Sequence, residues 1–437
     1  MLVAQTNRLH RLLADVDVRP GEPTRGRHAG HVLSSHFQPI YSPSHTRVVG
    51  HEALVRATGS QGQPIAPPLL FQSCRDEDEL AWCDSLSRVV HISNFARQGP
   101  QAQWLFLNVH PSAFQRLVLP DGDRYLRAVH RHFAIGGERL VLEVLESAVS
   151  NPEAFDDAVG IARQTGCLIA IDDFGAGHSN FDRVWRIQPD IVKLDRSLVV
   201  RAAKDRRAQR MVSQMVSLLH ECGAMVLMEG IETLDEALFA MEADADMVQG
   251  YFFGRPQAEL VPDGYAPECL QGLYTGLGQL RQRQRVQHRN AIAPFLNAAG
   301  HAGVLLSAGR SMEEACGPFL DLPGAELCYV LDSGGYQIGE NLWSTASLAQ
   351  PRIAYEPLRD SRGACWARRP YFRRAIEAVE KVQVTRPYRT LHGNHLCVTV
   401  SVSFHVTDGQ RSELRVVCGD VAWEDAAGTG HADDTRF

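Results

Sequence analysis

The residues best suited to chemistry lie in one stretch, 168–180, which reads Leu-Ile-Ala-Ile-Asp-Asp-Phe-Gly-Ala-Gly-His-Ser-Asn. Its apolar start is continuous, as is typical of a buried parallel strand, and it runs directly into Asp172 and Asp173. Two adjacent acids at a strand end need a partner, because an unpaired buried carboxylate is costly. A divalent cation held by oxygen ligands meets that need. We favour it over the simpler alternative of a helix cap followed by an exposed acid.

Polar residues also stand at the ends of the neighbouring predicted strands. They are Asn108, Glu143, Lys193, Glu229 and Gln249. In a barrel built of β/α units, sites are assembled at the carboxyl ends of the strands. Any one of these residues could instead cap a helix, form an ion pair or satisfy buried backbone groups. Their recurrence at successive strand ends favours a common site.

Oxygen ligands of this kind can build a centre for two cations. The ligands of the first cation would be Glu52, Asn108, Glu143 and Asp172. Asp172 can bridge to a second cation, which Asp173 contacts directly or through water. Such ligands suit Mg²⁺ or Mn²⁺ better than zinc. Paired cations about 4 Å apart serve in-line displacement at phosphorus.

Three further residues have side chains that could act on a phosphodiester. Lys193 is the one base among the strand-end residues, and its ammonium can orient water and reduce local negative charge. Glu229 can accept a proton or contact a cation through water. Arg56 lies on the same strand face as Glu52 and can clamp a phosphate, the alternative being an ion pair at the barrel rim.

These side chains must be positioned by alternating strands and helices. Hairpin strands are predicted at 37–41 and 46–50, and a helical period covers 69–98. Further strands are predicted at 104–109, 140–144, 168–172, 191–194, 225–229 and 247–250, with helices at 111–119, 152–164, 204–222 and 234–243. Repeated β/α units over this length indicate a parallel sheet closed into a (β/α) barrel.

A second domain of α+β type follows the barrel. Its predicted elements are a hairpin over 328–339, a helix at 370–381, and strands at 398–404 and 414–420. We expect an antiparallel sheet with helices on one side. The whole chain of 437 residues then divides into a flexible N-terminal segment (1–30), the barrel (31–262), a connector helix (263–300), the second domain (301–424) and a disordered tail (425–437).

Composition limits the possible partners and the cellular location. The formal net charge of −7 argues against general affinity for duplex nucleic acid. No apolar run reaches the length of a membrane span, and the first thirty residues lack the core of a signal peptide, so a cytoplasmic location is expected. The ten cysteines form no C-x-x-C pair, and neither a zinc site nor a disulfide framework is expected from them.

Several ordered motifs together resemble those of EAL-domain cyclic-di-GMP phosphodiesterases. They are Glu52-Ala53-Leu54-x-Arg56, Asn108 before Pro111, Leu142-Glu143-x-x-Glu146, Asp172-Asp173-Phe174-Gly175-x-Gly177, Lys193-x-Asp195, Glu229-Gly230-x-Glu232-Thr233 and Gln249-Gly250-Tyr251-Phe252-x-x-x-Pro256. The resemblance covers residues 30 to 260. It implies a TIM-like (β/α)8 barrel with one antiparallel strand and hydrolysis of cyclic-di-GMP to linear pGpG. It also implies two Mg²⁺ or Mn²⁺ ions per site and inhibition by Ca²⁺.

The resemblance also implies a role for each matching residue. Glu52, Asn108, Glu143 and Asp172 match metal ligands, while Asp173, Lys193 and Glu229 match positions that serve the second metal and the water. Substrate contacts are implied for Gln38, Leu54, Arg56 and Gln249. Glu146 matches the acid that steadies the loop after the double aspartate, a loop often found at a dimer interface. A homodimer is therefore expected.

The sequence departs from the family pattern mainly in that loop. Ala176, His178 and Asn180 replace residues common in the family, and Met228 replaces a usual small residue. None of these changes removes a metal ligand. The retained acids favour an enzyme over the two rival interpretations, a catalytically silent cyclic-di-GMP receptor and an interaction scaffold that binds no nucleotide.

The second domain resembles a PAS- or Cache-like sensor in a few short motifs, among them Arg369-Pro370-Tyr371-Phe372, Arg386-Pro387-Tyr388 and a strand that ends in Gly419-Asp420. The resemblance implies an unknown small-molecule ligand and a regulatory role. It makes Arg369, Tyr371, Tyr388 and Asp420 candidate pocket residues. The alternative is that the aromatic residues are core and the arginines are surface residues.

Overall fold

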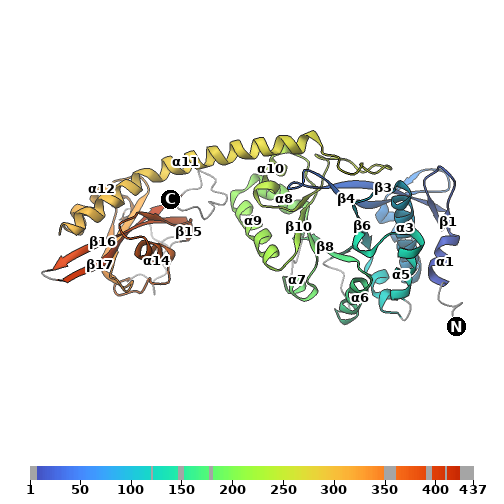
Figure 1. Cartoon of the computed structure of the whole chain (residues 1–437), viewed down its shortest axis with the longest axis horizontal. Coiled ribbons are helices and arrows are strands. Elements are labelled where there is room, and N and C mark those ends of the chain that lie inside the picture. The colour runs from blue at the N-terminus through green and yellow to red at the C-terminus, as the bar shows by residue number, and fades with distance from the viewer. Residues whose placement is uncertain are drawn as a thin grey trace. The chain divides into compact units, whose positions relative to one another are not determined.

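The computed structural model describes residues 7–119, 122–145, 152–176, 181–348, 361–389, 396–408 and 411–423. The chain divides into two compact units, Met1–Gln279 and Leu280–Phe437. Figure 1 shows a closed sheet ringed by helices in the first unit and a smaller sheet with its own helices in the second.

The first unit is a barrel of eight strands. They are β3 (His31–Ser42), β4 (Arg47–Thr58), β6 (Trp104–Val109), β7 (Leu140–Leu145), β8 (Leu168–Phe174), β9 (Ile191–Leu194), β10 (Met225–Met228) and β11 (Met247–Val248). The ring runs β3-β11-β10-β9-β8-β7-β6-β4 and closes through the pairing of β4 with β3. β3 is antiparallel to both of its neighbours, whereas the other pairings in the ring are parallel. The predicted TIM-like barrel with one antiparallel strand is confirmed.

Helices follow the strands around the barrel. They are α2 (Pro67–Gln72), α3 (Glu77–Gln98), α4 (Pro111–Gln115), α5 (Gly122–Phe133), α6 (Pro152–Gln164), α7 (Phe181–Ile187), α8 (Arg196–Lys204), α9 (Arg206–Glu221) and α10 (Leu234–Glu242). The helix predicted at 69–98 is two helices, because Asp76 caps α3 by accepting a hydrogen bond from the Glu79 N–H. Asp205 starts α9 in the same way and separates it from α8, so the boundary predicted at residue 204 is also wrong.

The N-terminal residues differ from the flexible segment expected at 1–30. Residues 7–28 form α1 (Asn7–Ala14), β1 (Val16–Asp17) and β2 (Arg25–His28), and β2 pairs with β3. Leu9 and Leu12, three positions apart on α1, are buried in the core of the barrel unit. Arg11 does not interrupt this packing, since its guanidinium lies over the Trp82 ring, 5.1 Å from the centroid.

A long helix, α11 (Glu268–Ser307), replaces the connector helix expected at 263–300. Its beginning belongs to the barrel unit, where Leu270, Leu273 and Leu277 are buried. Its end belongs to the second unit, where Ile292 and Phe295 are buried. The division between the two units therefore falls within this helix.

The second unit is built on an antiparallel sheet. Its strands are β12 (Ala325–Leu331), β13 (Gln337–Trp343), β14 (Gln383–Val384), β15 (Tyr388–Arg389), β16 (Leu396–Asp408) and β17 (Arg411–Ala422), in the order β13-β12-β17-β16-β14 with β15 beside β16. Its helices, apart from the end of α11, are α12 (Met312–Leu320), α13 (Thr345–Leu348) and α14 (Pro370–Glu377). The predicted α+β arrangement is confirmed, and the expected tail at 425–437 lies outside the described residues.

Helices cover both faces of this sheet, so the expectation of helices on one side is wrong. Val400 and Val402 share a buried cluster with α11 and α12. The alternating residues Thr399, Ser401 and Ser403 are also buried, on the opposite face. Ser401 Oγ donates to the Tyr371 carbonyl of α14 at 2.8 Å. The hydroxyls of β16 suggested a solvent-exposed face in the sequence, but each has a partner. Ser401 bonds to α14, Thr399 to Asp420, and Ser403 accepts the Glu380 N–H that follows α14.

Candidate active site

The site residues stand two positions beyond an apolar layer that fills the barrel. This layer consists of Ile40, Phe106, Val141, Ala170, Ile191, Leu227 and Met247. Side chains two apart on a strand point to the same face. Asn108, Glu143, Asp172, Lys193, Glu229 and Gln249 follow six of these layer residues by two positions each. Their side chains are therefore directed into the barrel mouth above the layer.

Lys193 occupies the centre of this group. Its Nζ lies 2.7 Å from Glu143 Oε1, 2.9 Å from Asp172 Oδ1, 3.3 Å from Glu229 Oε2 and 3.8 Å from Glu52 Oε1. The lysine side chain is 1% exposed. Four carboxylates thus converge on one buried ammonium, three from the predicted strand ends and Glu52 from within β4.

Glu52 is held by two amides. Asn108 Nδ2 donates to Glu52 Oε1 at 2.9 Å, and Gln249 Nε2 donates to Glu52 Oε2 at 2.7 Å. Asn108 comes from the neighbouring strand β6, and Gln249 follows β11 on the other side of the antiparallel strand β3. The amides fix the carboxylate's orientation and leave its remaining lone pairs available.

The double aspartate ends β8 at the mouth of the barrel. Oxygens of Asp172, Asp173 and Glu229 lie within 4.8 Å of one another. Asp173 has a φ of 55°, a left-handed conformation that is uncommon for a residue other than glycine, and its N–H donates to Asp172 Oδ1 at 3.0 Å. Gly175 follows at φ 96°, and a Cβ there would lie 2.2 Å from Leu198 Cδ1. The glycine is needed because both backbone conformation and space exclude a side chain.

The crowding of acids changes their protonation. Burial raises the pKa of Glu143 well above its usual value, with Lys193 opposing the shift. Burial also raises the pKa of Glu229, to about 8. Burial would lower the pKa of Lys193, but the attraction of Asp172, Glu143, Glu229 and Glu52 together raises it well above its usual value. One ammonium therefore does not balance the acids, and without another cation the charged forms of Glu143 and Glu229 are both disfavoured.

The side chains fit divalent cations. Every ligand group is an oxygen donor, as Mg²⁺ and Mn²⁺ prefer. Both carboxylate oxygens of Glu143 are buried and accept no hydrogen bond from the described residues, although Oε1 lies close to the lysine ammonium. A bound divalent cation would give these buried oxygens a partner and would neutralise the excess negative charge.

The expected substrate contacts lie on the same side of the barrel. Gln38 on β3 pairs in register with Glu52, and its Nε2 donates to the Gly254 carbonyl at 3.3 Å. Leu54 and Arg56 follow Glu52 on β4 at two-residue spacing, and both are half-buried. Arg56 donates to the Val55 carbonyl at 3.0 Å. Glu146 and the loop residues His178 and Asn180 lie outside the described residues.

One positioning pair was missed in the sequence. Asp84 on α3 pairs with Arg88 four residues later, and Asp84 Oδ1 accepts the His110 N–H at 3.2 Å. Through this contact α3 holds the segment that follows Asn108. The signal in the sequence is an acid and a base four positions apart inside a helix that is otherwise largely apolar.

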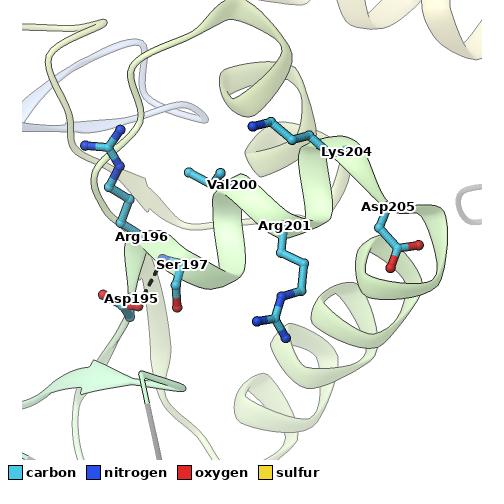
Figure 2. A pocket seen from close by; sticks show the side chains of 7 residues that line it. All are labelled: Asp195, Arg196, Ser197, Val200, Arg201, Lys204 and Asp205. Atoms are coloured by element: carbon cyan, nitrogen blue, oxygen red, sulfur yellow. Dashed lines mark hydrogen bonds between the residues drawn. The ribbon is translucent and has the colours of Figure 1, made fainter.

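An open hollow of about 660 Å³ lies beside the barrel mouth but is distinct from the acid cluster. Figure 2 shows its lining along α8, where Asp195 accepts a hydrogen bond from the Ser197 N–H. The remaining lining residues are Arg196, Val200, Arg201, Lys204 and Asp205. We place the chemistry at the acid cluster, because the hollow contains none of the buried carboxylates.

Of the four residues singled out in the second unit, Tyr371 and Asp420 are buried, whereas Arg369 and Tyr388 are half-buried. Tyr388 OH lies 2.5 Å from Thr399 Oγ1, which donates to Asp420 Oδ1 at 2.7 Å. The Tyr371 ring packs edge-on against Tyr329, and the Arg369 guanidinium lies 5.9 Å from the centre of the Tyr388 ring. Burial raises the pKa of Asp420 to about 7. The structure thus brings these residues together around a single carboxyl group.

The fold and the acid cluster define a β/α-barrel protein with a cluster of acids, suited to divalent cations, at the carboxyl ends of its strands. Residues 25–256 match the model of the EAL domain, and the chain belongs to the EAL-domain family. Within the described residues, no helix combines the length and apolar character that crossing a bilayer requires.

Named relatives and a solved structure agree with this assignment. The chain is 31% identical over 245 residues to an uncharacterized protein of Azorhizobium caulinodans. The match covers 54% of this chain and 33% of that protein. It is 26% identical over 232 residues to the cyclic di-GMP phosphodiesterase RocR of Pseudomonas aeruginosa, covering 52% of this chain and 58% of RocR. The chain thus spans less than two thirds of the length of these relatives.

The solved structure is that of the Bacillus subtilis YkuI protein, with an EAL domain, in complex with substrate c-di-GMP and calcium. The likeness has a TM-score of 0.74 at 19% identity and covers 90% of this chain and 96% of YkuI. At this identity the likeness concerns the fold alone. Its coverage extends beyond the barrel into the second unit.

Proposed function

We propose that this protein is a metal-dependent phosphodiesterase that hydrolyses cyclic-di-GMP to linear pGpG. The observation that carries the proposal is the convergence of four carboxylates on the buried ammonium of Lys193 at the barrel mouth. Family membership and a relative named as a cyclic di-GMP phosphodiesterase support the choice of substrate.

The chain's own residues divide into two overlapping ligand groups. Glu52, Asn108, Glu143 and Asp172 would hold one Mg²⁺ or Mn²⁺ ion, and Asp172 with Asp173 would hold a second. When bound, such cations lower the pKa of water and neutralise charge on phosphoryl oxygens. Because Asn108 Nδ2 donates to Glu52 Oε1, the amide oxygen of Asn108 is free to act as a ligand.

The remaining residues act on water and on the substrate. Lys193 keeps its proton and holds Asp172 and Glu143 in place, and it lowers the negative charge that an attacking hydroxide would meet. Glu229, opposite Asp172 and Asp173, is positioned to accept the proton of the attacking water. Substrate contacts are proposed for Gln38, Leu54, Arg56 and Gln249, and steadying of the loop after the double aspartate for Glu146.

Calcium is proposed as an inhibitor. Ca²⁺ takes longer bonds and more oxygen ligands than Mg²⁺, so it can occupy the acids without the geometry that displacement at phosphorus requires. The YkuI complex with substrate c-di-GMP and calcium supports the idea that substrate remains bound in such a state. We expect added Ca²⁺ to suppress turnover that Mg²⁺ or Mn²⁺ supports.

The decisive experiment is incubation of the purified protein with cyclic-di-GMP and Mg²⁺ or Mn²⁺, with pGpG detected by chromatography. Glu52→Ala should abolish pGpG formation while cyclic-di-GMP binding without metal survives. Binding without turnover by the intact protein would replace the enzyme with a receptor that signals through its second unit. Failure to bind cyclic-di-GMP in calorimetry would leave only the scaffold interpretation.

We also propose that the second unit is a PAS- or Cache-like sensory domain that tunes the barrel's activity. The support is its antiparallel sheet and the buried polar group around Asp420, which would contact a small ligand through Arg369, Tyr371 and Tyr388. A screen of small acids and amines by thermal shift should find a ligand whose effect is lost in Asp420→Ala. An unchanged ligand response in that variant would remove the pocket assignment.

Finally, we propose a homodimer. Its support is Trp185 on α7 of the barrel unit, a large apolar side chain that is 78% exposed. Light scattering on the eluting protein should give twice the chain mass, and Trp185→Ser should shift it toward the single-chain mass. A single-chain mass for the intact protein would exclude the homodimer.

A further inference from the structure

A second group of metal-ligating side chains lies away from the barrel mouth. It consists of His28 at the end of β2, Cys74 between α2 and α3, and Cys83 within α3. The histidine nitrogen and the two sulfurs all lie within 4.8 Å of one another. β4 runs six residues past Glu52 to Thr58, which pairs with Val32 near the β2–β3 turn. At about 3.3 Å per residue, that places the group roughly 20 Å from the acid cluster along the strand.

Local structure explains why residues so far apart in sequence meet here. The turn after His28 contains Ala29 and Gly30, both with positive φ, and it folds β2 back onto β3. Asp76 caps α3, which places Glu79 and Cys83 at i,i+4 on one face of that helix. The backbone thus brings one nitrogen and two sulfurs close together, and Glu79 Oε1 lies beside the histidine while its Oε2 pairs with Arg75.

The histidine is poised as a ligand. Its Nε2 is buried and has no hydrogen-bond partner among the described residues, and Glu79 Oε1 lies 3.6 Å away, beyond hydrogen-bond distance. The His28 and Glu79 side chains are each 12% exposed. Burial lowers the pKa of His28, so the imidazole is neutral at pH 7 and keeps a free lone pair. A buried nitrogen without a partner needs an explanation that ordinary packing does not give.

We propose that His28, Cys74 and Cys83 bind a zinc ion, with Glu79 Oε1 as the fourth ligand. Two sulfurs, one imidazole and one carboxylate are a donor set that zinc accepts in tetrahedral geometry. With bonds of about 2.0–2.3 Å, the ligand atoms of such a site lie about 3.3–3.8 Å apart, which side-chain rotation can reach from the present separations. Mg²⁺ and Mn²⁺ prefer oxygen donors, so the two sites select different metals.

The two thiols release their protons on binding, and the ion then joins three separate parts of the chain. The N-terminal hairpin would be tied to the α2–α3 connection and to α3. The absence of a C-x-x-C pair argued against zinc in the sequence. Cys74 and Cys83 nevertheless come close together, because the chain turns into α3 at the Asp76 cap between them. The third ligand comes from a strand more than forty residues earlier.

The first test is the metal content of the full-length, tag-free protein, purified without chelator and equilibrated with equimolar zinc. One zinc per chain is expected by mass spectrometry of the metal. Cys74→Ser and His28→Gln, both at partly exposed positions that the fold tolerates, should each weaken zinc binding more than tenfold in chelator competition. Cys222→Ser, at a similarly half-buried free cysteine, should leave zinc binding unchanged.

A cobalt titration separates this site from the acid cluster. Cobalt bound here should show a thiolate-to-metal charge-transfer band that Cys74→Ser abolishes and Glu52→Ala preserves, because the barrel mouth offers no sulfur. Loss of the band in Glu52→Ala but not in Cys74→Ser would overturn the proposal. So would a chain that binds no zinc, or thiol counting that finds Cys74 and Cys83 joined in a disulfide. None of these outcomes depends on phosphodiesterase activity.

Discussion

Both units bury carboxylates, but in opposite electrostatic settings. At the barrel mouth, Glu52, Glu143, Asp172 and Glu229 surround Lys193 within 3.8 Å. In the second unit, Asp420 accepts a hydrogen bond from Thr399, which is itself within hydrogen-bond distance of Tyr388. Burial and the buried acid Glu326 act to raise the pKa of Asp420, and Arg369 acts to lower it. The barrel site thus gathers four acids around one ammonium, whereas Asp420 is held mainly by a hydroxyl group.

The difference shows how neutralisation depends on available partners. Asp420 can become neutral by holding one proton, since burial raises its pKa to about 7. The barrel has more acids than one lysine can neutralise, and acids that take up protons can no longer bind metal well. Metal ions can neutralise these acids while they stay ionised. A ligand for the second unit should therefore be small and respond to one carboxyl group, whereas the barrel should respond to divalent cations.

The largest effect is expected from removing the central ammonium. Lys193→Met keeps the side-chain length but removes the positive charge among four carboxylates. Turnover should fall by about 10²–10⁴-fold, the range typical of a residue that acts on proton transfer and charge in the transition state. Metal affinity should change much less than turnover, because the bound cations themselves partner the acids that lose the ammonium. The measurement is kcat with Mn²⁺ beside a manganese titration.

A matched control is Lys204→Met, at an exposed position on α8. That variant should turn over substrate at the normal rate. Normal turnover by Lys193→Met would remove the assigned role, and unfolding of that variant in the presence of Mn²⁺ would make the lysine a structural residue.

A smaller effect on metal affinity is expected from changing Gln249, which bonds to the proposed metal ligand Glu52 and not to the cation itself. Gln249→Leu deletes the donor to Glu52 Oε2 and leaves that carboxylate held by Asn108 alone. Metal affinity or activity should fall by about 10–100-fold, as is typical when an outer partner of a ligand is changed. Calorimetry with Mn²⁺ measures it. Gln282→Leu, exposed on α11, is the control, and equal behaviour of the two variants would contradict the role of Gln249.

The barrel mouth could be predicted from the sequence because polar residues recur at the ends of successive apolar strands. Asn108, Glu143, Lys193 and Glu229 each follow a strand that is recognisable from its own apolar run, and parallel strands end at one rim. No long-range knowledge was needed to bring them together. The antiparallel strand β3 entered only through the family resemblance, since a hairpin in the sequence does not say which neighbour closes a barrel.

Other parts of the structure depend on contacts that no local pattern contains. The N-terminal segment was expected to be flexible because it is polar and rich in Arg, Gly and Pro, yet Arg8 and Arg11 lie over the rings of Tyr125 and Trp82. The two-sided cover of the second sheet depends on α14 packing over the hydroxyls of β16. Cys74, Cys83 and His28 meet only through a helix cap and a strand turn. Sequence spacing alone could not bring these residues together.

The two sites can also be compared by pH. An acid whose pKa is raised in the folded state stabilises the fold below its unfolded pKa, and this stability is lost as pH rises through the folded value. Metal-free protein should therefore lose stability from about pH 5 to pH 8, by up to about 1.4 kcal/mol per pH unit for each such group. Glu229→Gln should remove the part of this loss that extends to about pH 8. Asp420→Asn should remove the part that ends near pH 7.

Metal should reverse the trend at the barrel alone. Cations compete with protons for Glu143 and Glu229, so the affinity for Mn²⁺ should rise with pH up to about 8 in wild type. The same rise should persist in Asp420→Asn, because Asp420 lies in the other unit. Thermal unfolding with and without Mn²⁺ across pH 5 to 9 tests both points. A pH-independent affinity would show that the barrel acids are already ionised.

The smallest effect should come from the second unit's hydroxyl chain. Thr399 has one proton, which it donates to Asp420, so the proton between Tyr388 and Thr399 must come from the tyrosine. Tyr388→Phe removes that one hydrogen bond and should lower the free energy of unfolding by about 1 kcal/mol. Tyr336→Phe, at a tyrosine that is 53% exposed, should be neutral. Chemical denaturation of both variants measures the difference. A loss several times larger would mean that Tyr388 also determines whether Asp420 is ionised. The second unit would then contain a coupled charge network like that of the barrel mouth.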